Sequence, residues 1–355
     1  MTDVLYLNLD KNLIKNGLGG KRHIEGIIES CPGHIRLSVA SVDAHNLQGN
    51  YSVINLDRIY FYYQIFLLMR RSNFSAVIVR KTLFGMYLFA GLLLILRLYK
   101  QQPKAVIEFN GISGDFRIKN RLIRFIFLII NIIPLYFYDY VYAVNSNIRD
   151  RIVKFQSNLS EKILVCANGC FIVNNQRCIA SKPYSKFQFV FYGSNQDKYH
   201  LYDFCMHINK LAEGYHIDLI GYGFESFNEF KNVRVLGAMS STQFTEYLMS
   251  QECIPIGIIP LDNLFGQVNI VPIKAMDYIS FGLPVLHSVH CLHSFRGNLS
   301  FCEADIYNPS NFKSKLAHFS KILDKPESVR SNIEELRYKY SWKRNLEPLW
   351  SALKD

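Results

Sequence analysis

Short apolar runs alternate along this chain with stretches long enough to form helices, and this alternation restricts the possible folds most strongly. The apolar runs cover residues 4–7, 34–39, 76–79, 105–108, 140–144 and 163–166 in the first half, and 187–192, 217–220, 233–236, 254–259 and 284–287 in the second. Strands separated by helices form βαβ units, whose strands are parallel. The pattern therefore predicts an α/β protein with parallel sheets.

The two series of runs are separated by a polar segment at 174–186, NNQRCIASKPYSK, which contains a proline. We interpret it as a linker between two Rossmann-like domains that face each other across a cleft. The first domain is expected at 1–173 and the second at 187–338. Residues 339–355 are expected to form a helix that returns to the first domain.

The charge of the chain is distributed unevenly between its halves. The 355 residues include 40 Lys and Arg against 29 Asp and Glu, a net charge of +11. Residues 1–180 hold 22 basic and 11 acidic side chains, whereas residues 181–355 hold 18 of each. This excess predicts that the N-terminal domain faces an anionic partner. We expect no nucleic acid, because no element combines basic residues with stacking side chains.

Two apolar segments in the basic half favour a membrane surface as that partner. Residues 82–96, TLFGMYLFAGLLLIL, carry no charge but are shorter than the roughly 20 residues of a spanning helix. We interpret them as a buried core helix, with a membrane-bound helix as the alternative. Residues 117–138 predict a helix that lies on a bilayer, with a core helix as the alternative. Its expected membrane-facing residues are Arg117, Lys119, Arg121 and Arg124.

The start of the sequence and the cysteines indicate the compartment. The first residues, MTDVLYLNLDKN, lack the basic start, apolar run and cleavage site of a signal peptide. The eight cysteines include one closer group, Cys166, Cys170 and Cys178, without CxxC spacing or a nearby histidine. We therefore expect a cytoplasmic protein with reduced thiols and no metal, bound peripherally to the inner face of the cell membrane.

Two polar loops of the first half follow predicted strands. Gly19, Gly20 and Lys21 precede a helix expected to open at about His23, and they suit an anion at the helix end, although a plain turn would look the same. Glu108 and Asn110 end the strand at 105–108. They are candidates for holding sugar hydroxyls or for moving a proton, and helix capping is the alternative for Glu108.

Further glycines follow the strands of the second half in a characteristic order. Gly193-Ser194, Gly221-Tyr222-Gly223 and Leu236-Gly237 are followed by KAMDYISFGLPV at 274–285. This set resembles the donor domain of GT-B glycosyltransferases, particularly the retaining family-4 type. The similar segments of the rest of the chain are VIEFNG at 106–111, residues 138–152, residues 163–172 and the Tyr-Ser-Trp at 340–342.

The resemblance implies a hexosyltransferase-type enzyme that binds a nucleotide-sugar donor. Its implied donor-binding residues, together with the glycine loop, are Gly19, Gly20, Lys21, Gly193, Ser194, Lys198, Gly221, Gly223, Leu236, Gly237, Asn269, Ile270, Lys274 and Asp277. The catalytic candidates are Lys274, Asn269, Glu108 and Asn110. Lys274 would face the donor phosphates, and a solvated helix residue is the alternative.

Three positions depart from the family pattern. Asn269 and Asp277 stand where the family has glutamates that contact the donor sugar and the ribose. Asp277 can still accept hydrogen bonds from ribose hydroxyls, whereas Asn269 brings no negative charge to the transition state. Lys198 is the only cation after the glycine of the first donor-domain strand, where the family has an arginine and a lysine.

The expected reaction uses no cofactor. No Asp-x-Asp pair occurs in the sequence, which predicts metal independence. The resemblance implies transfer with retention, in which the leaving phosphate receives the acceptor proton. It also implies a lipid-linked saccharide acceptor in capsule or O-antigen synthesis. Two alternatives remain: a nucleotide-sugar 2-epimerase, against which the basic first half argues, and a non-catalytic nucleotide-sugar-binding homologue, which the departures at Asn269 and Asp277 favour.

Overall fold

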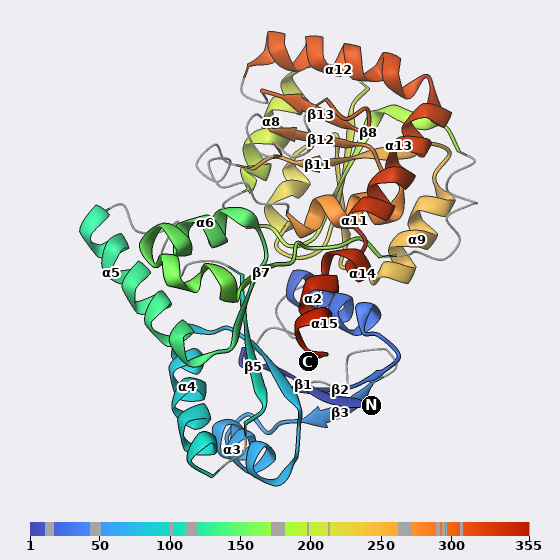
Figure 1. Cartoon of the computed structure of the whole chain (residues 1–355). Helices are drawn as coiled ribbons and strands as arrows, with labels where there is room; N and C mark the ends of the chain where they lie inside the picture. Colours follow the sequence, from blue (N-terminus) through green and yellow to red (C-terminus); the bar gives the residue numbers. More distant parts are fainter. Residues whose placement is uncertain are drawn as a thin grey trace. The chain divides into compact units, whose positions relative to one another are not determined.

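The structure is a computed structural model of the chain (Figure 1). It describes residues 1–10, 18–42, 51–99, 102–110, 120–171, 182–196, 199–211, 214–261, 272–288, 292, 295, 297–305 and 308–354. The chain divides into two compact units. Unit 1 contains Met1–Asn168 and Trp342–Asp355, and unit 2 contains Gly169–Ser341. Each unit has one parallel sheet flanked by helices, so the expected pair of Rossmann-like domains is confirmed.

The sheet of unit 1 has seven parallel strands in the order β3-β2-β1-β4-β5-β6-β7. The strands are β1 (Thr2–Asn8), β2 (Ile35–Ser41), β3 (Ser52–Asn55), β4 (Ala76–Arg80), β5 (Lys104–Phe109), β6 (Tyr140–Ala143) and β7 (Ile163–Val165). Successive side chains of β1, β4 and β5 are buried, so both faces of the central sheet are covered. This burial explains their nearly continuous apolar sequences.

Helices connect these strands. They are α2 (Leu18–Ser30), α3 (Phe61–Arg71), α4 (Leu83–Leu98), α5 (Arg121–Ile132) and α6 (Ser146–Phe155), with the 3-10 helices η2 (Ile133–Phe137) and η3 (Ser157–Lys162). Polar side chains fix several helix starts: Thr82 accepts a hydrogen bond from Gly85 N at α4, and Asn120 accepts one from Leu122 N at α5.

The end of the chain belongs to unit 1 and forms two short helices, α14 (Trp342–Asn345) and α15 (Glu347–Ala352). A single helix was expected, but a proline in the first turn of α15 starts a second one. Trp342 packs against α2, where a Cβ at Gly26 would lie 2.2 Å from the indole. Trp350 Nε1 donates a hydrogen bond to Ser30 Oγ at 3.1 Å.

The sheet of unit 2 has six parallel strands in the order β10-β9-β8-β11-β12-β13. The strands are β8 (Tyr184–Tyr192), β9 (His216–Ile220), β10 (Val233–Gly237), β11 (Ile254–Ile259), β12 (Val285–Ser288) and β13 (Phe301–Ala304). The helices are α8 (Leu201–Leu211), α9 (Ser241–Ser250), α11 (Ile273–Phe281), α12 (Pro309–Leu323) and α13 (Pro326–Lys339), with the 3-10 helix η5 (Glu225–Glu229).

Every apolar run expected as a strand is one, but three differences stand out. The strands β3 and β13 were not expected, because each has four residues of mixed polarity at the edge of its sheet. The third is the start of β8 at Tyr184, inside the segment expected as linker. The polar residues Ser185 and Lys186 occupy the partly exposed beginning of this strand, so its sequence is typical of a loop.

The two apolar segments form α4 and α5. In α4, Met86, Phe89 and Leu93 are buried, whereas Phe84 and Leu98 are exposed, so only one face of this helix belongs to the core. In α5 only the last two residues are buried. None of the helices in the described ranges combines the length and the apolar character needed to cross a bilayer.

Candidate functional site

Three strand ends of unit 2 are in direct backbone contact at one edge of the sheet. Gly193 and Gly221 directly follow β8 and β9, and Gly237 ends β10, with φ angles of 137°, 146° and 72°. Gly221 N donates a hydrogen bond to Gly237 O at 2.8 Å. A Cβ at Gly221 would lie 1.8 Å from Gly193 O, so only glycine fits there. We call these three residues the glycine shelf.

Asn195 extends the glycine shelf on the side of β9. Its backbone N donates to Tyr222 O at 2.9 Å, and its Nδ2 donates to Gly223 O at 3.0 Å. Gly223 has a φ of 80°, the left-handed conformation that glycine adopts easily. The loops after β8 and β9 are therefore held together at the carboxyl edge of the sheet, where ligands bind in open α/β folds.

The amine of Lys274 lies beside the glycine shelf. Lys274 is in the first turn of α11 and only 6% exposed. Its Nζ donates to Tyr192 O at 2.8 Å and lies 4.1 Å from the centroid of the Phe191 ring. A Cβ at Gly193 would lie 2.0 Å from Nζ. A cation, glycine backbone and a helix N-terminus thus occur together, a combination suited to a phosphate anion.

Contacts of the next turn hold α11, and with it Lys274, in a fixed orientation. Tyr278 OH accepts a hydrogen bond from Tyr192 N at 3.1 Å and lies 3.1 Å from Ile258 O, to which it can donate. The ring also packs on β11, where a Cβ at Gly257 would lie 2.7 Å from it. Asp277, on the same turn, is 6% exposed.

Unit 1 has a buried polar network at the carboxyl edge of its sheet. Glu108 is completely buried near the end of β5. Its Oε2 accepts a hydrogen bond from Tyr6 OH at 2.6 Å. Its Oε1 accepts hydrogen bonds from Arg80 Nη1 at 2.6 Å and from Asn110 Nδ2 at 2.5 Å, and lies 3.2 Å from His23 Nε2. The Glu108 network is therefore the set Tyr6, His23, Arg80, Glu108 and Asn110.

The charges of the Glu108 network stabilise one another. Burial raises the pKa of Glu108, but the opposing effects of Arg80 and His23 are larger and bring it from 4.5 to about 2. Burial lowers the pKa of Arg80, and the Glu108 carboxylate outweighs this effect and raises it. Burial and the Glu108 charge raise the pKa of Tyr6. Glu108 and Arg80 therefore form a buried ion pair over the whole physiological range.

A partly buried lysine of unit 1, Lys81, lies directly after β4. Lys81 Nζ donates a hydrogen bond to Asn131 Oδ1 of α5 and lies 3.7 Å from the centroid of the Phe109 ring. Burial lowers the pKa of Lys81 from 10.5 to about 7. The lysine thus links the end of β4 to the buried end of α5.

The predicted site residues that the structure describes fall into two groups. Unit 2 carries Gly193, Ser194, Gly221, Gly223, Leu236, Gly237, Lys274 and Asp277, and unit 1 carries Gly19, Gly20, Lys21, Glu108, Asn110, Arg121 and Arg124. The residues Arg117, Lys119, Lys198, Asn269 and Ile270 lie outside the described residues.

The glycine loop of unit 1 is placed differently from the expectation. Because α2 begins at Leu18 rather than at about His23, Gly19 and Gly20 lie in its first turn. The first amides of a helix have no intrahelical acceptor, so they can still attract an anion. Lys21 Nζ lies 3.8 Å from Glu25 Oε1.

Sequence reasoning missed Tyr6, His23 and Arg80. One signal was present: Arg80 ends the otherwise apolar β4, and Glu108 interrupts the otherwise apolar β5. These two residues are direct partners in the β4–β5 register. A metal site was not expected, and the described part of the chain contains no group of three His, Cys, Asp or Glu residues that could hold a metal ion.

Comparison with known proteins begins with two negative findings: no protein-family model and no curated protein matches the sequence. Solved structures do match along the whole chain. Alr3699/HepE from Anabaena, solved with UDP and glucose, has a TM-score of 0.69 at 11% identity and covers 100% of both chains. The lipopolysaccharide outer core galactosyltransferase WaaB has a TM-score of 0.59 at 12% identity and covers 99% of this chain and 100% of its own.

Sucrose-phosphate synthase from Thermosynechococcus elongatus has a TM-score of 0.64 at 8% identity and covers 99% of this chain and 98% of its own. The chain has the GT-B fold. In this GT-B chain the carboxyl edges of the two sheets differ in chemistry. The edge of unit 2 combines backbone amides with a buried amine, whereas the edge of unit 1 carries the Glu108 network.

Proposed function

We propose that the protein is a glycosyltransferase of the hexosyltransferase type. Unit 2 binds a nucleotide-sugar donor, and unit 1 binds a saccharide acceptor carried on a lipid. The observation that carries the proposal is the amine of Lys274 beside the glycine shelf, in a chain with the GT-B fold. The neighbour Alr3699/HepE was solved with UDP and with UDP-glucose, and the neighbour MnaA from S. aureus with UDP, which makes a UDP-sugar the first donor to test.

Lys274 and the start of α11 hold the diphosphate of the donor in this proposal. Both place positive charge where the leaving group becomes more negative during transfer. Asp277, one turn along α11, accepts hydrogen bonds from the ribose hydroxyls. Asn269 contacts the donor sugar, and Lys198 and the loop after β8 complete the diphosphate contacts.

Transfer exchanges one bond of the sugar for another. The bond between the anomeric carbon and the leaving phosphate oxygen breaks, and a bond to the acceptor oxygen forms. The acceptor oxygen attacks from the face that the phosphate leaves, so the configuration is retained without a protein nucleophile, and the acceptor proton passes to the leaving phosphate. The buried oxygens of Glu108 already accept several hydrogen bonds, so we assign it to positioning Asn110, which is exposed at the sheet edge.

The surface of α3, α4 and α5 supports the proposal of a lipid carrier. These helices contain no acidic residue and five arginines. Most of the large apolar side chains that are exposed among the described residues lie between residues 59 and 136. A basic and apolar surface of this kind suits an anionic membrane. We propose that the protein works at the inner face of the cell membrane, in capsule or O-antigen synthesis.

A donor screen tests the proposal. The purified protein is incubated with UDP-, GDP- and CMP-sugars, and both the thermal shift and the release of nucleotide are measured, with and without a lipid-linked acceptor. We expect one nucleotide to stabilise the protein, and we expect its sugar nucleotide to release that nucleotide only when acceptor is present. Binding without release under any condition would instead support a non-catalytic nucleotide-sugar-binding protein.

The variant Lys274→Met links this activity to the site. It removes the charge but keeps the length of the side chain, and we expect transfer to fall by 10- to 100-fold, about 1.4 to 3 kcal/mol of barrier stabilisation. Lys321→Met, on the exposed face of α12, is the matched control and should leave the rate unchanged. Equal rates for the two variants would contradict the role of Lys274.

A further inference from the structure

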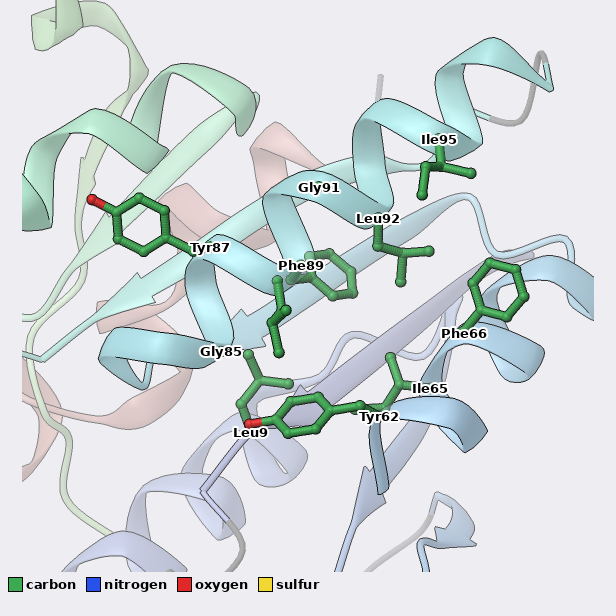
Figure 2. A pocket seen from close by; sticks show the side chains of 11 residues that line it. Leu9, Tyr62, Ile65, Phe66, Gly85, Tyr87, Phe89, Gly91, Leu92 and Ile95 are labelled. Atoms are coloured by element: carbon green, nitrogen blue, oxygen red, sulfur yellow. The ribbon is translucent and has the colours of Figure 1, made fainter. Parts of the chain in front are cut away.

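A groove on unit 1 lies between α3 and α4 (Figure 2). Its volume is about 390 Å³, within the usual range for small-molecule sites. Its walls include Ile65 and Phe66 of α3, Phe89, Leu92 and Ile95 of α4, and Leu9. All of its lining residues are apolar, aromatic or glycine.

Such a lining holds water poorly. A water molecule needs two to four polar partners, and the hydroxyls of two tyrosines are the only side-chain polar groups among the lining residues. Burying the exposed apolar surface under hydrocarbon would be favourable by roughly 25 cal/mol for each Å² removed from water. The groove therefore favours an apolar ligand over solvent.

The shape of the groove suits an extended chain. The lining residues of α4 run from Gly85 to Ile95, which corresponds to about 15 Å along the helix axis. Leu9 directly follows the carboxyl end of β1, and Gly85 lies in the first turn of α4. One end of the groove is therefore at the carboxyl edge of the sheet, the edge that also carries Asn110 of the Glu108 network.

The charge around the groove selects the type of ligand. Neither α3 nor α4 contains an acidic residue; their arginines, Arg70, Arg71 and Arg97, lie in the last turns of the two helices, away from Gly85, and Arg97 Nη2 lies 3.6 Å from Asp139 Oδ1. The next helix, α5, adds Arg121 and Arg124, both exposed. Helices without carboxylates, beside the two exposed arginines of α5, complement an anionic lipid better than a neutral one.

We propose that this groove binds one hydrocarbon chain of a phosphate-bearing lipid, and that this lipid is the carrier of the acceptor. The inference rests on the proposed function and adds a binding site to it. A chain bound along α4 holds the lipid phosphate and its saccharide at the carboxyl edge of the unit 1 sheet. Acceptor recognition then depends on the lipid tail as well as on the sugar.

Gly91 offers a direct way to fill the groove. It lines the groove in the middle of α4, and a Cβ there would meet nothing within 4 Å. Gly91→Phe should therefore place a ring in the groove without disturbing the helix backbone. Gly91→Ala adds only a methyl group and is the matched control. Ile95→Gln, at a half-exposed lining position, makes the groove polar without filling it.

The experiment measures binding of monoalkyl phosphates with 4, 8 and 12 carbons by titration calorimetry, below their micelle concentrations and without a bilayer. For the unmodified protein we expect affinity to rise about fourfold for each buried methylene, until the chain exceeds the groove. Gly91→Phe should weaken binding of the 12-carbon phosphate at least tenfold, Ile95→Gln should weaken it several-fold, and Gly91→Ala should change it less than twofold.

Affinity that does not depend on chain length would overturn the inference, as would equal binding by the Gly91→Phe and Gly91→Ala proteins. If α3–α5 instead insert into a bilayer and the groove binds no single hydrocarbon chain, the affinity for alkyl phosphates will not depend on chain length. The thermal shift with UDP, read on the same proteins, separates the two proposals. Chain-length-dependent binding without any response to nucleotides supports the groove and contradicts the transferase.

Discussion

Replacing Glu108 by glutamine should destabilise unit 1 by about 3 kcal/mol at neutral pH. The lowering of the Glu108 pKa from 4.5 to about 2 corresponds to roughly 3 kcal/mol of net stabilisation of the carboxylate, which remains after the opposing effect of burial. Loss of one partner of a buried ion pair costs a similar 3 to 5 kcal/mol, because the other charge stays buried. That charge is Arg80, whose side chain is 12% exposed.

The pH dependence of this difference identifies its origin. The folded-state pKa of Glu108 lies below the unfolded value, so its contribution is complete above about pH 4.5 and is lost as the pH falls toward 2. The difference in unfolding free energy between the wild type and Glu108→Gln should therefore be largest near pH 7 and should shrink below pH 4.5.

Native-state hydrogen exchange is the suitable assay, because the two units need not unfold together. Peptides from β1 and β5 report on unit 1, and peptides from β8 and β11 of unit 2 serve as the internal reference. Glu327→Gln is the control: its carboxylate pairs with Arg330 but is 85% exposed, so we expect a change below about 0.5 kcal/mol. Combining Glu108→Gln with Arg80→Met should recover at least 1 kcal/mol, because no buried charge then lacks its partner.

A loss below 1 kcal/mol for Glu108→Gln would refute this reasoning. A loss that stays the same from pH 7 to pH 3 would refute it too, since it would then come from altered packing rather than from charge. If the double variant is no more stable than Glu108→Gln alone, the loss of stability does not come from leaving the buried charge of Arg80 without its partner.

Three further predictions concern the shelf, the membrane surface and the metal. Gly221→Ala should cost at least 3 kcal/mol or so of unit 2 stability in urea unfolding, because the new Cβ would lie 1.8 Å from a backbone carbonyl; a change below 1 kcal/mol would contradict the shelf geometry. Replacing Arg121 and Arg124 by serine should weaken binding to anionic liposomes about 30-fold, whereas the same change at Lys313 and Lys321 should not; equal effects would mean that only net charge matters. Transfer should continue in EDTA, and inhibition reversed by a divalent cation would disprove metal independence.

The sequence predicts most of the fold because strands buried on both faces leave a continuous apolar signal. That signal identifies β5 and β11 from their residues alone. It fails for β3 and β13, whose edge positions let polar residues enter. Their pairing depends on the neighbouring strand, and a local pattern carries no information about it.

The candidate site is predictable to the extent that it is local. Gly193 and Gly221 stand directly after apolar runs, so their place at a sheet edge follows from the sequence. The ion pair between Arg80 and Glu108 depends on the register of two strands 28 positions apart. The groove beside Gly91 likewise requires the packing of two helices, and an apolar helix sequence does not distinguish a filled interface from an open one.

The return of the chain end to unit 1 has a consequence for synthesis on the ribosome. Unit 2, Gly169–Ser341, is continuous and can fold as soon as it has emerged, whereas unit 1 lacks Trp342 and Trp350 until the residues after unit 2 have been synthesised. At about 5 to 20 residues per second, the N-terminal segment waits roughly 10 to 35 s for them. During that interval the surface of α2 around Gly26 that Trp342 will cover is open to chaperones, so the domain translated first is the one completed last.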